Sequence, residues 1–352
     1  MLVAGGIALG ATEAFGAAGP RAAAVPAAKR AAIKAVALPA GFNGLIAYGR
    51  QGKVEHVRCV GLADIEAGRP FTEATQIRWG SVTKWLVSVA VLRLVEAKRL
   101  SLDAPIGTYL PDLPPETGGQ VRLRHLLSNT SGIPDLLGRQ VKVEPELRRS
   151  TVSAAAMAAR FAGGDLAFVP GQGWDYAALN WVLVAAIVEQ VTGEKLAAVV
   201  GRLVFGPLGM TSAGFVQSDQ PPLPALAAAY TATLPPVRKM GPVPPALAGS
   251  GNAAGGVRDA MRAAHGIFHG SLLRPASRAA LTTIAWPDEE YALGGRVRPI
   301  DGEPWGWETG KVEGYRTHIA HCLSRSETIV VFDTTDMVQS TIGGWVTAIA
   351  RA

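Results

Sequence analysis

The sequence feature that most constrains the fold is an uncharged apolar run that directly follows a short segment ending in lysine. The segment is Gly80-Ser81-Val82-Thr83-Lys84, and residues 85–92 after it carry no charge. A run of this kind predicts a helix that is buried on nearly all sides. Ser81 and Lys84 are three residues apart, so on a helix their side chains would share one face, about one turn apart.

Ser81 and Lys84 are therefore a candidate nucleophile and its base. The start of a helix has free N–H groups that stabilise negative charge on a serine oxygen. A lysine enclosed by apolar residues loses solvation, which lowers its pKa and lets it act as a base. The alternative is a serine that caps a helix, followed by a lysine in solvent, which is a common pattern without catalytic meaning.

Length and composition exclude several classes of protein. The chain has 352 residues, of which 48% are hydrophobic, so it can bury the core of one large domain or of two ordinary ones. Its net charge of +6 is spread out, and the basic pairs Lys29-Arg30 and Arg148-Arg149 are too short for a nucleic-acid stripe. No stretch after residue 40 is long and apolar enough to span a bilayer. We expect no nucleic-acid partner and no integral membrane span in the mature chain.

Residues 1–25 differ from the rest of the chain. Leu2 to Ala11 is apolar and small, and Ala22-Ala23-Ala24 offers a small-x-small cleavage site before Val25. This pattern resembles a secretory signal peptide, although the basic n-region is missing and Glu13 is out of place. We favour a truncated export signal over an alanine-rich disordered leader, and expect a periplasmic or secreted protein.

Periodicity along the remaining chain predicts strands near both ends and helices between them. The expected elements are a hairpin at 44–63, helices at 150–161, 180–191, 194–204 and 258–269, strands at 305–309, 315–322 and 328–333, and a closing helix from about residue 342. This order predicts a sheet built from both chain ends, with a helical insertion and a functional cleft between the two parts. The assigned parts are an α/β domain at 26–105 and 250–352, a helical domain at 106–230, and a proline-rich linker at 231–249.

Three segments carry a resemblance to a known family. The stretch 82–103 resembles the start of the class C β-lactamase and penicillin-binding protein family, which includes carboxylesterases, and Ser-x-x-Lys is the nucleophile motif of such hydrolases. Leu126–Gly132 is similar to the family's His-Thr-Ser-Gly turn, with Asn129 in place of His, and Gly206–Met210 matches its Pro-Leu-Gly-Met segment. The resemblance, from about residue 44 onward, implies an α/β plus all-α, β-lactamase/transpeptidase-like fold.

The resemblance also implies the remaining catalytic groups. Tyr176 falls on the family's tyrosine, which acts as a base together with the lysine; the alternative is an ordinary core tyrosine before a helix. The asparagine of that motif is replaced by Ala178, and Asn180 is too far along to substitute for it. The resemblance places the oxyanion donors on the backbone N–H groups of Ser81 and Lys311.

The family's third motif, Lys-Thr-Gly or His-Thr-Gly, is Glu308-Thr309-Gly310 here, and the resemblance makes these three residues substrate-binding. An anion at residue 308 is expected to repel carboxylate substrates and to raise the pKa of Tyr176, leaving Lys84 as the principal base. Alternatively, the Glu308 side chain points into solvent or forms a salt bridge, for which Lys311 and Arg316 are the nearest candidates in sequence.

Together these residues indicate a serine hydrolase that acts through an acyl-enzyme on small-molecule esters, amides or β-lactams. We favour ester hydrolysis, because Ala178 and Glu308 replace groups that recognise amide and carboxylate. The alternatives are a β-lactamase or D,D-peptidase, and a catalytically weak relative that only binds ligand. No organic cofactor is implied. No metal site is expected either, because His265 and His269 share one helical face without a third ligand nearby. The oligomeric state stays open.

The two cysteines, Cys59 and Cys322, both lie in strand-like runs. By family resemblance, the sheet runs from the second N-terminal strand through the first to the last C-terminal strand, and then to the strand before it. Two strands would then separate the cysteines, by roughly 14 Å at ~4.8 Å per strand, whereas a disulfide needs Cα atoms within about 7 Å. We expect two free thiols.

Overall fold

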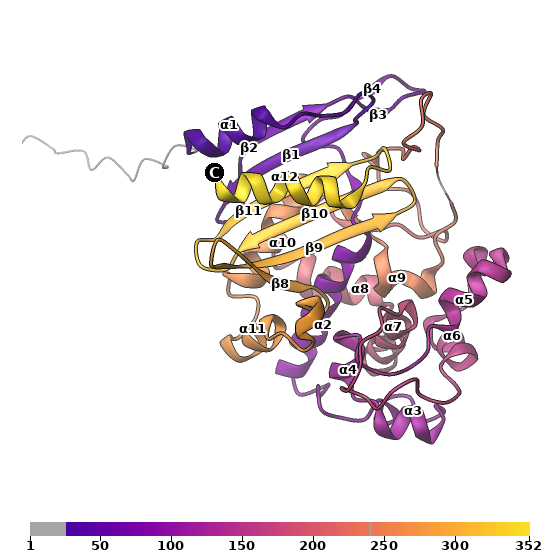
Figure 1. Ribbon diagram of the computed structural model, residues 1–352. Helices are drawn as coiled ribbons and strands as arrows, with labels where there is room; N and C mark the ends of the chain where they lie inside the picture. The colour runs from indigo at the N-terminus through magenta and orange to yellow at the C-terminus, as the bar shows by residue number, and fades with distance from the viewer. Residues whose placement is uncertain (1–25, 240) are drawn as a thin grey trace, which may run out of the picture.

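A computed structural model describes residues 26–239 and 241–352. Its centre is a six-stranded antiparallel sheet of order β2-β1-β11-β10-β9-β8 (Figure 1). The strands are β1 Gly44–Arg50, β2 Lys53–Val60, β8 Arg296–Ile300, β9 Glu303–Val312, β10 Tyr315–Cys322 and β11 Glu327–Asp333. The sheet therefore joins the N-terminal hairpin to the C-terminal strands, and the strand order expected for β2, β1, β11 and β10 is confirmed.

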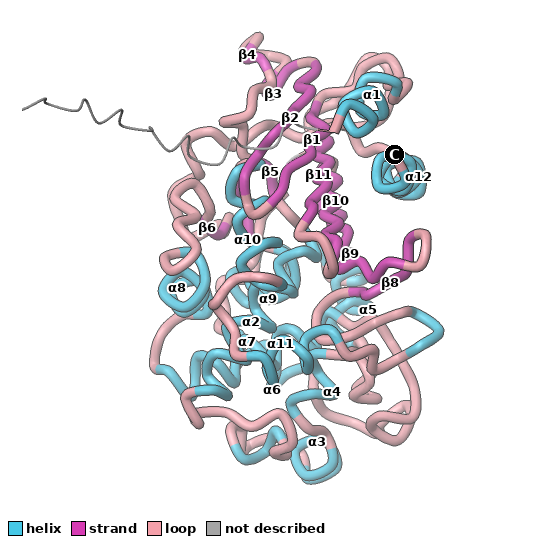
Figure 2. Tube along the Cα trace, turned by 90° about the vertical axis from the view of Figure 1, so that its left-hand side faces the viewer, coloured by secondary structure: helices cyan, strands magenta, loops and turns pink. Residues whose placement is uncertain are grey.

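Helices cover both faces of this sheet. Helices α1 (Ala27–Ala35) and α12 (Gln339–Arg351) lie on one face, and α10 (Val257–Phe268) lies on the other (Figure 2). Because side chains alternate across a strand, β11 contributes Ile329 and Val331 to the first face and Val330 and Phe332 to the second. The middle of this strand, residues 329–332, is apolar on both faces for this reason.

Helix α2 (Thr83–Glu96) is the buried helix that the apolar run predicts. Every residue from Thr83 to Leu92 is buried, so the helix lacks a polar face of its own. Ser81 lies one turn earlier, in a 3-10 helix spanning Gly80–Val82. Strand β5 (Ile77–Arg78) leads into this turn and pairs with β7 (Ala253–Gly255), which also pairs with β6 (Gly214–Phe215).

The segment between α2 and β7 is mainly helical. Its helices are α3 Pro115–Gln120, α4 Leu123–Leu127, α5 Leu136–Val143, α6 Ala154–Phe161, α7 Ala178–Thr192, α8 Leu196–Val200 and α9 Ala248–Gly251. The predicted helices at 150–161 and 180–191 correspond to α6 and α7, and α7 ends at Gly193, whose φ of 73° permits a left-handed cap. The helix expected at 194–204 starts later, and its second half is a π-helix at Gly201–Phe205.

Several short elements were not expected from the sequence. Strand β8 escaped prediction because its run, Arg-Val-Arg-Pro-Ile, contains a proline that only an edge strand tolerates. Others are α11 (Pro275–Thr282), the two-stranded ribbon of β3 (Leu62–Asp64) with β4 (Arg69–Pro70), and the small sheet of β5, β6 and β7.

The proline-rich stretch is held against the sheet. Tyr230 N donates to the Thr334 carbonyl at 2.7 Å, and Lys239 Nζ lies 2.8 Å from Asp336 Oδ2. One continuous apolar cluster includes Val89 of α2, Leu183 of α7 and residues of the sheet, so it extends through both of the assigned domains. The boundaries between these domains stay a prediction.

Other predictions concern the cysteines, the leader and the membrane. Cys59 and Cys322 are both free, as expected, and lie on β2 and β10 with β1 and β11 between them. The predicted export signal at 1–25 lies outside the described residues. Within the described part of the chain, no helix is both long and apolar enough to cross a bilayer.

Candidate active site

The three predicted catalytic side chains meet at the start of α2. Tyr176 donates its hydroxyl hydrogen to Ser81 Oγ at 2.7 Å, and Lys84 Nζ lies 3.1 Å from the same oxygen. Ser81 and Lys84 are placed together by the helix, as their spacing predicts. Tyr176 comes from the loop before α7, so only the tertiary fold brings it there.

Burial makes Lys84 a usable base. Its Nζ donates to the Ser250 carbonyl at 2.5 Å, and the rings of Tyr176 and Trp181 lie 5.0 and 5.5 Å away. Burial lowers the pKa of Lys84 to about 7, and the opposing effect of the Glu308 carboxylate is smaller. A substantial fraction of Lys84 is therefore neutral at physiological pH and can accept the serine proton.

Tyr176 keeps its proton under the same conditions. Removal of the hydroxyl from water raises the pKa of Tyr176, and the Glu308 carboxylate raises it further. The hydrogen bond to Ser81 acts in the opposite direction and is a smaller effect. Tyr176 is thus suited to the role of a neutral hydrogen-bond donor and Lys84 to that of the principal base. This is the division of roles that an anion at residue 308 predicts, and it stays a prediction.

Two glycines bring β9 against the serine turn. Gly80 has a φ of 52°, and a Cβ added there would lie 2.8 Å from the backbone nitrogen of Lys311. A Cβ added at Gly310 would lie 1.9 Å from the Trp79 carbonyl oxygen. Only glycine permits this approach. It sets the Lys311 N–H beside the turn that carries Ser81, where the predicted oxyanion donor is needed.

Glu308 does not contact the cleft in the way the sequence suggested. Its side chain is 1% exposed, and Arg296 Nη1 of β8 lies 3.7 Å from its Oε2. Neither Lys311 nor Arg316 is its partner, and Arg316 instead pairs with Asp336. Burial raises the pKa of Glu308, while Arg296 and then Lys84 lower it. Glu308 therefore acts on Lys84 and Tyr176 from within the protein, and a direct substrate contact is not available to it.

A cleft of about 370 Å³ opens at Ser81. Its lining residues are Arg78, Gly80, Ser81, Lys84, Asp135, Val141, Arg148, Tyr176, Ala178, Pro242, Val243, Pro244, Leu247, Ser250, Gly251, Asn252, Lys311, Val312 and Glu313. Thr309 and Gly310, which the resemblance made substrate-binding, are not among them; the next three residues of the hairpin take that place. The predicted linker thus supplies part of the cleft wall.

Ala178 lines the cleft at the position where the family motif has an asparagine. Asn180 does not take the place of that asparagine. Asn180 is 1% exposed and its Nδ2 donates to Asn129 Oδ1 at 3.2 Å. Its Oδ1 accepts from Ser131 Oγ at 2.7 Å. Asn129, which stands in the family's histidine position, thus joins a buried network that supports the start of α7.

Several groups around the site were missed by sequence reasoning. The Ser250 carbonyl, Trp181 and Arg296 contact reacting or charged groups, and Tyr291 packs edge-on against Tyr176 with ring centroids 6.1 Å apart. A backbone carbonyl and aromatic rings carry no sequence pattern of their own. Only Arg296 had a visible signal, as a basic residue in a run of otherwise strand-like character.

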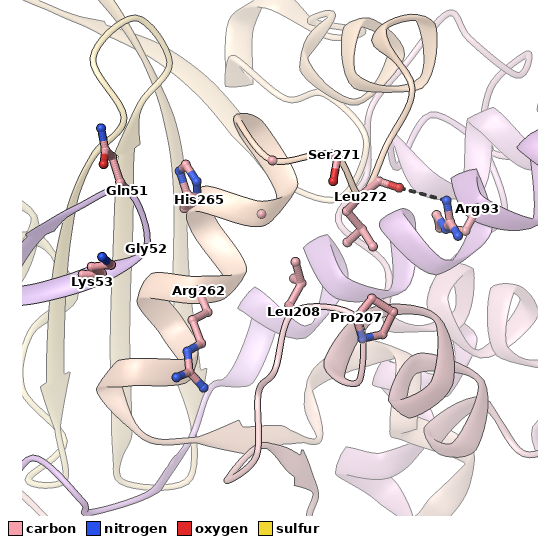
Figure 3. A pocket seen from close by; sticks show the side chains of 12 residues that line it. Gln51, Gly52, Lys53, Arg93, Pro207, Leu208, Arg262, His265, Ser271 and Leu272 are labelled. Atoms are coloured by element: carbon pink, nitrogen blue, oxygen red, sulfur yellow. Dashed lines mark hydrogen bonds between the residues drawn. The ribbon is translucent and has the colours of Figure 1, made fainter.

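A second pocket, of about 510 Å³, lies between the β1–β2 turn, α10 and the segment after it (Figure 3). Arg93 points toward the carbonyl of Leu272 and donates to it at 3.1 Å. His265 Nδ1 lies 2.8 Å from Ser326 Oγ. Arg93 and His265 thus already form hydrogen bonds within the protein. The residues that line this pocket include no pair of nucleophile and base comparable to Ser81 and Lys84.

The histidines differ in one respect from the expectation. A third imidazole does lie nearby, because His321 Nε2 is 2.8 Å from His269 Nδ1. The other nitrogen of His321 is 2.8 Å from Thr328 Oγ1, so both of its nitrogens are engaged. Among residues 26–239 and 241–352, no group of three or more His, Cys, Asp or Glu side chains could hold a metal ion.

A serine oxygen between a lysine and a tyrosine, with a backbone N–H beside it, defines the Ser-x-x-Lys class of hydrolases. The family model described as Beta-lactamase matches residues 31–340, so the chain belongs to the Beta-lactamase family.

Among curated relatives, the chain is 40% identical over 192 residues to esterase EstB of Burkholderia gladioli, which is 48% of this chain and 46% of EstB. It spans about half the length of the curated relatives it matches.

Solved structures confirm the fold. The penicillin-binding protein from Bacillus halodurans superposes with a TM-score of 0.75 at 22% identity, covering 88% of this chain and 96% of that one. EstCE1, a hydrolase with promiscuous acyltransferase activity, gives a TM-score of 0.69 at 21% identity, covering 87% and 93%. At these identities the likeness concerns the fold alone.

Proposed function

We propose that this chain is a carboxylesterase-like acyl hydrolase that works through an acyl-enzyme on Ser81. The observation that carries the proposal is the position of Ser81 Oγ, 3.1 Å from Lys84 Nζ and 2.7 Å from the Tyr176 hydroxyl, in an open cleft. Neutral Lys84 accepts the Ser81 proton while the oxygen attacks the ester carbonyl. The N–H groups of Ser81 and Lys311 hold the resulting oxyanion.

The second half of the reaction uses the same residues in reverse. The protonated Lys84 returns its proton, through the Tyr176 hydroxyl, to the departing alcohol, which leaves an ester on Ser81. Water then attacks that ester, and Lys84 again takes the proton. Regeneration of Ser81 releases the carboxylic acid, so that each turnover consumes one water molecule.

Three observations favour esters over amides and β-lactams. Ala178 in the cleft wall has no amide with which to hold an acylamino group. Glu308 is a buried anion where the family has a cation that faces the cleft. The relative at 40% identity, EstB, is named as an esterase.

The proposal is tested by a fluorophosphonate probe followed by a substrate panel. The probe should label the native protein but not the Ser81→Ala variant. The matched control is Ser88→Ala, which changes a buried serine one turn after Lys84 on α2 and should still be labelled. Short acyl esters should be hydrolysed faster than matched amides and a chromogenic cephalosporin. Turnover of the cephalosporin, or stable labelling by fluorescent penicillin, would support the β-lactamase or peptidase alternative. No labelling at all would support a ligand-binding relative.

A further inference from the structure

Among the described residues, the buried guanidinium of Arg78 forms neither a hydrogen bond nor an ion pair. Its side chain is 6% exposed. Its Nε is buried and has no hydrogen-bond partner, and no carboxylate among the described residues lies within 4 Å of the guanidinium. A buried charge without a partner is strongly destabilising and calls for an explanation.

Arg316 shows what the same side chain looks like when the protein satisfies it. At 5% exposed, it is buried as deeply as Arg78. It donates to the carbonyl oxygens of Met337, Glu313 and Tyr315, and it forms an ion pair with Asp336. The guanidinium of Arg316 thus has hydrogen-bond acceptors and a carboxylate partner, whereas that of Arg78 has neither among the described residues.

The backbone holds Arg78 in place. Arg78 ends β5, where it pairs with Ala254 of β7, and its carbonyl accepts from Thr317 Oγ1 of β10 at 3.3 Å. The next residue, Trp79, is fully buried and donates its backbone N–H to Ala253 at 2.8 Å. The backbone that carries Arg78 is thus fixed, and Arg78 lines the cleft that contains Ser81.

The other charges of the cleft do not neutralise it. Lys311 and Arg148 are exposed cations on the lining. Asp135 accepts from Gly138 N at 3.2 Å and caps α5. The Glu313 carboxylate raises the pKa of Arg78 but forms no ion pair with it. The cleft therefore carries more positive than negative charge beside the nucleophile.

We propose that Arg78 binds a carboxylate carried by the substrate, so that the preferred esters are anionic. A guanidinium matches the two oxygens of a carboxylate with parallel hydrogen bonds, and the cleft of about 370 Å³ suits a small molecule. This inference rests on the proposed esterase function. It also reverses the charge preference that Glu308 suggested from the sequence, because Glu308 is buried away from the cleft and Arg78 lines it.

The test uses two matched pairs of esters, one for each side of the scissile bond. The first pair is mono-para-nitrophenyl glutarate and its methyl ester; the second is para-acetoxybenzoate and its methyl ester. The proposal expects kcat/KM to favour the carboxylate in at least one pair. Arg78→Gln should reduce that preference by about tenfold or more, since a charge-assisted hydrogen bond is lost. Hydrolysis of the neutral ester should change by less than about threefold.

Two variants control for general charge and for the guanidinium itself. Arg148→Gln removes an exposed arginine from the same cleft and should leave the preference unchanged. Arg78→Lys keeps the positive charge without the paired donors and should retain part of the preference. A thermal melt of Arg78→Gln should show no loss of stability, because an unpartnered buried charge is removed. Equal loss on both esters with a lowered melting temperature would show a structural role and overturn the proposal.

Binding to Ser81→Ala separates this inference from the proposed function. Calorimetry with the carboxylate ester should give a dissociation constant that rises about tenfold or more when Arg78→Gln is added. The neutral ester should show no such change. Selective binding without turnover in the native protein would refute the esterase and retain the carboxylate site. An affinity indifferent to Arg78, or no binding of the carboxylate ester at millimolar concentration, would overturn the site whatever the activity.

Discussion

Arg296 Nη1 lies 3.7 Å from Glu308 Oε2, close enough for an ion pair but too far for a hydrogen bond. Arg296 is shared with Glu289, whose Oε2 is 3.1 Å away. Burial raises the pKa of Glu308 to about 7, and Arg296 and then Lys84 oppose this rise. The ionised carboxylate acts on both Lys84 and Tyr176. The consequence is a base whose pKa is set by two opposing effects, burial and this carboxylate.

Replacing Glu308 should change the pH dependence of the reaction. The carboxylate raises the pKa of Lys84 against the larger effect of burial, so Glu308→Gln lowers that pKa. The acidic limb of kcat/KM, expected near pH 7 in the native protein, should move to lower pH by about one unit, the low end of what a neighbouring opposite charge produces. Glu303→Gln, on the exposed end of the same strand, should leave the limb in place. A limb that stays fixed or rises would show that Glu308 does not act on the base.

Ser81→Ala should reduce hydrolysis by ~10³-fold or more, because the covalent route is lost. Ser88→Ala should retain activity, since its hydroxyl lies one turn beyond Lys84 on the buried helix. Mass spectrometry after an acylating inhibitor should place the adduct on Ser81. An adduct on any other serine would contradict the mechanism.

Gly310→Ala should disable the oxyanion donor. The new Cβ would lie 1.9 Å from the Trp79 carbonyl oxygen, so β9 must move away from the serine turn. A displacement of about 1 Å at a reacting centre costs on the order of 10²-fold in rate. The matched control is Gly344→Ala, an exposed α12 glycine with open space around it, which should stabilise the helix by up to ~1 kcal/mol. Full activity in Gly310→Ala would exclude the close approach described here.

Titration of the denatured, unreduced protein should find two free thiols. Cys59 and Cys322 lie on strands separated by β1 and β11, too far apart for a bridge. We expect two free thiols whether or not the protein is exported. Absence of reactive thiols would require a different pairing of the strands or a bond between two molecules.

We also propose that the mature protein begins near Val25 and is found outside the cytoplasm, on the basis of the apolar leader and its small-x-small site. Expression from the full natural reading frame, followed by fractionation and N-terminal sequencing, checks this. A cytoplasmic protein that retains Met1 would refute it.

The sequence predicted the site where one segment carries the chemistry, and failed where distant segments meet. Ser81 lies in the 3-10 turn and Lys84 in the buried helix that directly follows it, so spacing and apolar context located both. Tyr176 was placed by resemblance, since nothing local distinguishes it from a core tyrosine. The partner of Glu308 could not be derived, because Arg296 belongs to an edge strand that contains a proline and was not predicted.

The fold follows the same division. Alternating and apolar runs predicted the strands at both ends of the chain and the buried helices α2 and α7. The proline-rich stretch was read as a linker because prolines end helices and strands. Its packing depends on contacts with distant residues, such as Lys239 with Asp336, and those contacts place Val243 and Pro244 in the cleft wall.

The pairing of Gly44 with Asp333 in the centre of the sheet bears on how the protein is made. During synthesis, β1 leaves the ribosome long before β11 exists to pair with it, and β9 arrives only shortly earlier than β11. Neither the central ladder nor the Lys311 donor can form on the nascent chain until then. Contacts so distant in sequence fold slowly. The complete site around Ser81 therefore forms only late, when the last strands pair with the first.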